Sequence, residues 1–342
     1  MARSPAGRRP RWADWPTEKL LDLRFRDLGL DHRGTWIEEE VGALHEALAR
    51  RGLSFRPHVW LSTEWFTPTG VPGFAVPFYL AHPRLARLER SLVLEVEGGN
   101  RQEFRQILRH ECGHALQNGW ALNRRRRWRE LFGRSSERYP DRYRPDPSSR
   151  NHVQHLRMYY AQSHPDEDFA ETFAVWVGPR DLWRKRYAGW PALQKLEYID
   201  ELMDEVRATP QKVRSRRQVD PVGRLDRTLR EHYQERLEET PRDVADIYDA
   251  DLERLFIKDP DAGEPAARFL RRHASELRSL VTGFSGQDAF TLDQVLQDMI
   301  RRCRVLKLRA AGHEATLLMQ FSVLLTVQTM HLLYRRREWV SM

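Results

Sequence analysis

The sequence predicts an α+β fold followed by an all-α bundle, and three observations support this. Short apolar and aromatic runs between residues 59 and 96 have the length and the flanking turn residues of strands. From residue 100 the apolar residues recur with the period of a helix, and beyond residue 225 almost the whole pattern is helical. With 342 residues, 10% of them aromatic, the chain can bury a sizeable core, which excludes disorder throughout.

The first half of the chain predicts helices beside a small mixed sheet. Thr17–Leu28 is expected to be helical, and Thr35 can cap an amphipathic helix over Trp36–Arg51. Asn100 and Glu103 resemble a capping box, which marks the start of a further helix. Between these helices we expect three short strands: Val59–Phe66, Phe74–Leu80 (interrupted by Pro77) and Leu92–Val96.

The later part of the chain is divided by loops rich in turn residues. Gly133–Asn151 is too long for a simple connection and is expected to be an ordered functional loop or lid, after which helices cover about 166–177 and 191–208. Five helices are expected in the last third: Arg227–Glu239, Pro241–Phe256, Glu264–Val281, Leu292–Ala311 and Glu314–Arg337. We therefore expect a basic flexible tail over 1–16, a mixed domain over 17–208, a basic linker over 209–224 and a helical bundle over 225–342.

The cysteine content and the first residues of the chain indicate the cellular compartment in which the protein is expected. The chain has two cysteines, Cys112 and Cys303, too few for a disulfide framework. Its first 13 residues hold four arginines but no apolar stretch like that of an export signal. Together these features predict a cytoplasmic location. The most apolar segment, Ala315–Leu333, contains several polar side chains, so it predicts a buried bundle helix and no membrane span.

Positive charge is concentrated between Ala121 and Arg150, where ten arginines face four acidic residues in a chain of net charge +8. The run Arg124–Arg127 is a candidate surface for an acidic partner, although a solvated loop is the simpler explanation. A nucleic-acid-associated protein using this run and Lys212–Arg217 is a further alternative. We do not expect a nucleic-acid partner, because no nucleic-acid-binding motif accompanies the two runs.

Residues 110–114 read His-Glu-Cys-Gly-His and match the pattern His-Glu-x-x-His. Because residues i and i+4 lie on one face of a helix, His110 and His114 can reach the same metal ion. Glu111 lies beside the first histidine and can hold a water molecule bound to that metal. The pattern therefore predicts a zinc site with both histidines as ligands.

A catalytic zinc usually has three protein ligands and one open position. A third histidine at position 120, with glycine at 117, is excluded because these positions hold Trp120 and Gln117. A later helix offers Glu167 and Glu171, again four residues apart. Glu167 is expected to bind the metal while Glu171 accepts a hydrogen bond from a ligand histidine. The alternatives are Glu171 as the ligand, or a solvated acidic helix N-terminus.

These residues resemble the gluzincin group of zinc metallopeptidases. More closely, the segment from Leu21 to Met203 is similar to a bacterial family called putative zinc-binding metallopeptidases. The resemblance implies a zincin-like metallopeptidase domain, one Zn²⁺ per chain and a peptide or protein substrate. It is weak in the C-terminal third of the chain.

More distant relatives imply roles for further residues. In lethal-factor-like peptidases a tyrosine precedes the ligand glutamate by seven residues, which corresponds to Tyr160 here, and Glu171 falls where that group has a glutamate beside the metal site. Such a phenol can donate a hydrogen bond to the oxyanion that forms on the scissile carbonyl. Tyr159, His155 and His164 are the alternatives for this role.

The expected reaction is the hydrolysis of a peptide bond by metal-activated water, with Glu111 as the general base. In zincin folds an extended substrate pairs with the edge strand of the sheet, for which Leu92–Val96 is the candidate. The alternative is a zinc-containing scaffold without turnover that acts through the helical C-terminal domain. The sequence leaves the substrate, the cleavage mode and the oligomeric state open.

Overall fold

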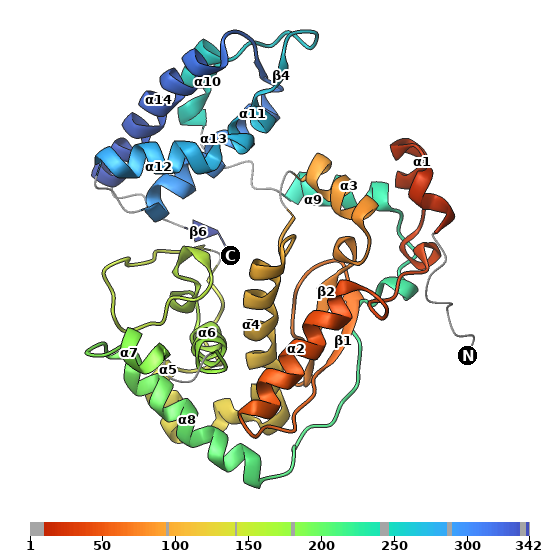
Figure 1. The fold of residues 1–342 in the computed structure, drawn as a ribbon, viewed down its shortest axis with the longest axis vertical. Helices are drawn as coiled ribbons and strands as arrows, with labels where there is room; N and C mark the ends of the chain where they lie inside the picture. Colours follow the sequence, from red (N-terminus) through yellow and green to blue (C-terminus); the bar gives the residue numbers. More distant parts are fainter. Residues whose placement is uncertain are drawn as a thin grey trace. The chain divides into compact units, whose positions relative to one another are not determined.

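The computed structural model describes residues 10–93, 96–140, 142–178, 182–239, 246–285, 289–335 and 340–341. The chain is mostly helical with small sheets, and it divides into two compact units, residues 1–237 and 238–341 (Figure 1). The segment 209–224 lies in the larger unit, where the indole of Trp60 donates to the Val219 carbonyl. The division into a 17–208 domain and a 225–342 bundle stays a prediction.

The larger unit begins with helices that surround a two-stranded sheet. In chain order its first elements are α1 (Thr17–Leu21), the 3-10 turn η2 (Phe25–Leu28), α2 (Trp36–Arg50), β1 (His58–Ser62), β2 (Gly73–Pro77), the 3-10 turn η3 (Phe78–Ala81) and α3 (Pro83–Leu92). The predicted cap of α2 is confirmed, because the Thr35 hydroxyl accepts from the Ile37 N–H at 3.2 Å. The predicted helix over 17–28 is broken into α1 and η2.

Strands β1 and β2 run parallel, in register from His58 opposite Gly73 to Ser62 opposite Pro77. On the other side of β2, Phe66 forms an antiparallel bridge with Ala75, so the pairing is mixed, as predicted. The second strand ends at Pro77, because proline has no N–H to donate to a neighbouring strand.

The predicted strand over Leu92–Val96 is wrong at its start. Leu92 is the last residue of helix α3 and Val93 follows it in a turn; residues 94 and 95 lie outside the described residues. The helix is favoured by Pro83 in its first turn and by the His82 ring, whose Nδ1 accepts from the Arg84 N–H at 3.1 Å. Leu85 and Leu88 have the spacing of a helix, and the helix continues to Leu92.

The second part of this unit is built around two helices. Its elements are α4 (Arg101–Trp120), η4 (Leu122–Arg124), α5 (Arg126–Phe132), β3 (Arg142–Tyr143), η5 (Arg157–Gln162), α6 (Pro165–Trp176), α7 (Leu182–Arg186), α8 (Ala192–Ala208), η6 (Val222–Arg224) and α9 (Leu229–Glu239). The capping box of α4 is confirmed: the Glu103 N–H donates to Asn100 Oδ1, and Asn100 Nδ2 donates to the Glu103 carboxylate, both at 3.0 Å. Helix α4 packs against α6 on one side and against α2 and β2 on another (Figure 1).

The helices α4 and α6 approach each other closely at a glycine. A Cβ atom on Gly113 would lie 2.9 Å from the Ala170 Cα and 3.1 Å from the Ala170 carbonyl oxygen. Real Cβ atoms do not come this close to backbone, so any larger side chain at position 113 pushes the two helices apart.

The smaller unit is mostly helical, but it also contains short strands, which the all-α prediction did not include. It contains η7 (Asp246–Tyr248), α10 (Asp249–Leu255), β4 (Glu264–Pro265), α11 (Ala266–Arg272), α12 (Ala274–Ser285), α13 (Ala289–Val305), β5 (Arg309–Ala310), α14 (Glu314–Arg335) and β6 (Val340–Ser341). Leu296 of α13 and Phe321 and Leu325 of α14 are buried in it.

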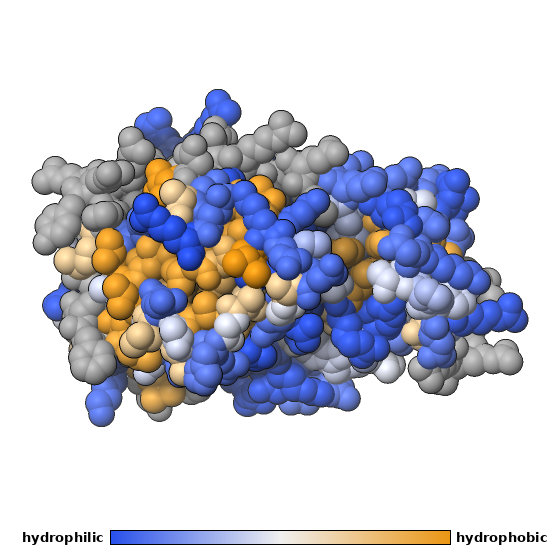
Figure 2. Space-filling view, turned by 90° about the horizontal axis from the view of Figure 1, so that it is seen from above, coloured by the Kyte–Doolittle hydropathy of each residue, from blue (hydrophilic) through white to orange (hydrophobic). Residues whose placement is uncertain are grey.

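On the outside of α14, Met319, Val323 and Val327 are exposed at a spacing of four residues; Figure 2 shows apolar side chains on the surface of this unit. Among the described residues, no helix has both the length and the low polarity that a bilayer crossing requires.

We predict that Gly113→Ala lowers the free energy of unfolding of the larger unit by about 1–3 kcal/mol, because the added methyl group overpacks the contact with Ala170. Urea unfolding followed by tryptophan fluorescence measures this, since all tryptophans except Trp339 lie in residues 1–237. The matched control is Gly42→Ala in α2, where a Cβ meets nothing within 4 Å. That variant should be more stable by about 0.5–1 kcal/mol. Equal unfolding of Gly113→Ala and the wild type would contradict the packing argument.

Candidate metal centre

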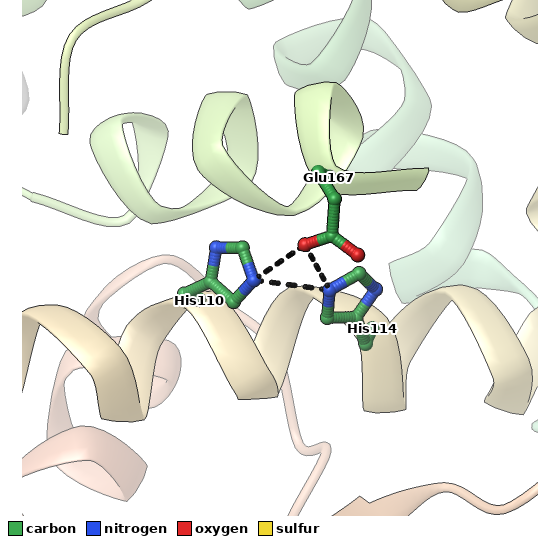
Figure 3. A group of neighbouring side chains, drawn as sticks. All are labelled: His110, His114 and Glu167. Carbon is green, nitrogen blue, oxygen red and sulfur yellow. Dashed lines mark hydrogen bonds and ion pairs between the residues drawn. The ribbon is translucent and has the colours of Figure 1, made fainter. Parts of the chain in front are cut away.

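Three side chains from α4 and α6 meet in the core of the larger unit (Figure 3). The Nε2 atoms of His110 and His114 are 3.0 Å apart, and Glu167 Oε2 lies 3.0 Å from the first and 3.1 Å from the second. The histidines are one helical turn apart on α4, and Glu167 is in the first turn of α6. The close approach at Gly113 and Ala170 brings that turn above the histidine pair.

The donor set fits a zinc ion. Tetrahedral zinc binds imidazole nitrogen and carboxylate oxygen at about 2.0–2.1 Å, which places its donors about 3.3 Å from one another. The three donor atoms are nearly at this spacing already. His110 is 3% exposed and Glu167 is 5% exposed, whereas the His114 side chain is 14% exposed, so most of the site is shielded from water. Two imidazoles with one carboxylate are a usual ligand set for a zinc that keeps an open position.

Glu171 lies behind His110, on the side away from the three donors. His110 Nδ1 donates to Glu171 Oε1 at 2.8 Å, and the Leu156 N–H donates to Glu171 Oε2 at 2.8 Å. Glu171 is completely buried. Since Nδ1 of His110 is engaged in this way, Nε2 is left as the nitrogen that faces His114 and Glu167.

The two buried carboxylates of the cluster need positive charge close to them. Burial by itself would lower the pKa of His110, but Glu167 and Glu171 raise that pKa well above its usual value. Burial works in the opposite direction on Glu167, whose pKa the two histidines nevertheless hold well below the usual range. Two buried carboxylates therefore require nearby positive charge, which either protonated imidazoles or a divalent metal ion can supply.

Glu111 is held by a residue outside the motif. The Thr67 hydroxyl, in the loop between β1 and β2, donates to Glu111 Oε2 at 2.7 Å. That loop is fixed to α4 by Asn118, whose amide donates to the carbonyls of Pro68 and Val71, both at 3.0 Å. The sequence does not predict this role of Thr67, because no local pattern relates it to Glu111, 44 residues later.

Tyr160 lies beside the cluster. Its ring centroid is 5.6 Å from that of His110, and burial together with the Glu167 and Glu111 carboxylates raises the pKa of its phenol. The phenol therefore stays protonated at neutral pH and can donate a hydrogen bond. The backbone just before it is unusual, since Met158 and Tyr159 both have left-handed φ angles, 63° and 53°.

The histidine alternatives to Tyr160 are engaged elsewhere. His155 Nε2 donates to the Gln106 carbonyl at 2.9 Å. His164 caps α6: its Nδ1 accepts from the Asp166 N–H at 3.1 Å, while its Nε2 donates to the Glu137 carbonyl at 3.0 Å. Both imidazoles therefore have structural roles in the loops around the centre.

A second tyrosine reaches the cluster from the loop predicted over Gly133–Asn151. The Tyr139 hydroxyl donates to Glu167 Oε1 at 2.9 Å, the oxygen that does not face the histidines. The sequence predicts a functional loop here, but no local pattern distinguishes Tyr139 within it. A loop residue shows no periodicity, so only the presence of an aromatic residue in a long ordered loop could have indicated it.

The arginine run Arg124–Arg127 is largely paired within the chain. Arg125 and Arg127 form ion pairs with Glu205 and Glu201 of α8, and Arg126 lies 3.2 Å from Glu130. These carboxylates neutralise much of the charge that the run would present to an acidic partner.

Comparison with known proteins gives one match. Residues 102–204 match a family model described as "Putative zinc-binding metallo-peptidase". The chain is similar to that family over this segment. The match covers α4 from its second residue and all of α6, and hence every residue of the His-His-Glu cluster, but less than half of the chain. No curated protein and no solved structure matches the chain.

We predict that Glu171→Gln weakens zinc binding about 10–100-fold, because it disturbs the acceptor that orients the His110 ring. Competition with a chromophoric chelator measures the affinity. The matched control is Glu89→Gln: Glu89 is a buried glutamate that binds Tyr233 and Arg236 at 2.7 and 2.6 Å, away from the cluster. It should lower stability but leave zinc affinity unchanged. Wild-type affinity in Glu171→Gln would show that His110 does not depend on this partner.

Proposed function

We propose that the protein is a zinc-dependent metallopeptidase. The observation that carries the proposal is the buried group of His110, His114 and Glu167, with Glu111 held beside it on the same helix. We assign the three as the ligands of one Zn²⁺ per chain and Glu171 as the partner that orients His110. We also propose that the domain has a zincin-like fold and that its substrate is a peptide or protein.

A zinc ion at this site supplies Lewis acidity toward the scissile carbonyl and lowers the pKa of a bound water toward about 7. Glu111 then acts as the proton carrier. Thr67 donates to Glu111 Oε2 and so fixes the position of the carboxylate. The carboxylate accepts the proton that the water molecule loses when the water oxygen bonds to the carbonyl carbon. Glu111 passes the same proton to the amide nitrogen as the carbon–nitrogen bond breaks, so it ends the cycle unprotonated.

We assign Tyr160 as the donor to the oxyanion. Its phenol stays protonated because its pKa is raised, and a donor fixed before the reaction stabilises charge that develops on the carbonyl oxygen. The two left-handed residues just before it support this assignment, because backbone strain of this kind is found at functional sites.

Two alternatives are less well supported. A non-catalytic zinc scaffold normally closes its metal with four protein ligands, whereas the described part of the chain offers three at this site. A nucleic-acid-associated protein would use Arg124–Arg127 and Lys212–Arg217, but no nucleic-acid-binding motif accompanies the two runs. In the first run, three of the four arginines are also paired with glutamates.

We predict that Glu111→Gln keeps zinc but lowers the rate of peptide hydrolysis by about 10²–10⁴-fold, because the amide cannot accept the proton from water. Cleavage of a pool of unstructured peptides, followed by mass spectrometry, measures the rate, and zinc content is determined on the same samples. The control Glu130→Gln changes an exposed carboxylate on α5 and should keep full activity. If Glu111→Gln cleaves peptides at the wild-type rate, Glu111 is not the general base.

A further inference from the structure

The segment 133–139 lies along the first turn of α6, and its alternate residues contact that turn. A Cβ on Gly133 would lie 2.9 Å from the Pro165 ring. Ser135 Oγ donates to Asp166 Oδ2 at 2.8 Å, and the Glu137 carbonyl accepts from His164 Nε2 at 3.0 Å. The last of these contacts is made by the Tyr139 hydroxyl, which donates to Glu167 Oε1 at 2.9 Å. Within the segment, the Glu137 N–H donates to the Arg134 carbonyl at 3.0 Å and closes a turn. The segment therefore contacts the ligand-bearing turn and its cap at four places.

Tyr139 is fixed by two contacts of different kinds. Its ring stacks on His164, with centroids 3.7 Å apart and planes 14° from parallel, and its hydroxyl donates to Glu167 Oε1. His164 cannot turn freely, because both of its ring nitrogens are hydrogen-bonded, to Asp166 and to Glu137. The ring of Tyr139 is therefore placed by α6 and by its own loop, although 43% of the residue is exposed.

The two oxygens of Glu167 thus have separate partners. Oε2 lies 3.0 and 3.1 Å from the two histidine nitrogens, whereas Oε1 is turned away from them and accepts a hydrogen bond from the Tyr139 hydroxyl. A carboxylate that gives both oxygens to a metal fills one more coordination position than a carboxylate that gives one. The open position of a catalytic zinc therefore depends on where Oε1 points.

We propose that Tyr139 is a positioning residue that makes Glu167 bind the metal through Oε2 alone and so keeps the fourth position open for water and substrate. This inference rests on the proposed function, because it assumes that His110, His114 and Glu167 hold a metal ion. The hydrogen bond from Tyr139 explains why the Glu167 carboxylate takes one orientation. It also gives the 133–139 segment a role in shaping the metal centre.

The test is Tyr139→Phe, which removes the hydroxyl and keeps the ring that stacks on His164. Cobalt(II) replaces zinc in the purified full chain, and its visible spectrum is recorded, because the intensity of the cobalt bands falls as the coordination number rises above four. We expect weaker and shifted bands in Tyr139→Phe. We also expect zinc affinity, measured by chelator competition, to be lower by about 10-fold or more, since the hydrogen bond to the ligand is lost.

The matched control is Tyr143→Phe. Tyr143 lies four residues later, and its hydroxyl donates to the Met158 carbonyl at 2.7 Å, so this variant loses a similar bond that does not involve a ligand. It should keep the wild-type spectrum and affinity. A wild-type spectrum and affinity in Tyr139→Phe, or equal changes in both variants, would overturn the role of Tyr139. A wild type that binds neither cobalt nor zinc would instead overturn the metal site itself, so the two failures are distinguishable.

Discussion

The close approach of two helices at Gly113 and Ala170 determines the rest of this site. The His-Glu-x-x-His spacing places two imidazoles on one face of α4, but a third donor for the proposed zinc site must come from another element. Because position 113 carries no side chain, α6 can come close enough for Glu167 to reach both histidines at 3.0–3.1 Å. The same approach places Glu171, one helical turn further along α6, beside Nδ1 of His110.

Burying so many carboxylates at one helix crossing requires a partner for each of them. Glu167 faces the histidines and Tyr139, and Glu171 accepts from His110 and Leu156. Burial raises the pKa of neighbouring Asp168 to about 7, and Lys195 opposes this shift with an Nζ–Oδ2 distance of 2.5 Å. Lys195 also donates to the Asn151 carbonyl at 2.8 Å, which ties the end of the long loop to α6 and α8. The centre is thus surrounded by hydrogen bonds that fix its geometry.

Local patterns predicted the parts of the site that a single helix determines. The capped start of α4 and the placement of His110 and His114 on one helix follow from residues near each other in the sequence. Thr67 and Tyr139 could not be found in this way, because their partners lie 44 and 28 residues away. The short apolar run Leu92–Val96 suggested a strand, but α3 continues to Leu92 because its proline start and leucine spacing favour a helix.

The central claim is that His110, His114 and Glu167 together hold one zinc ion. The most direct test is the zinc content per chain, by mass spectrometry, of wild type and Glu167→Ala after equilibration with excess zinc and dialysis, with Glu130→Ala as a surface control. The account predicts about one zinc per chain in the wild type and the control, and almost none in Glu167→Ala. Full zinc content in Glu167→Ala, or none in the wild type, would contradict it.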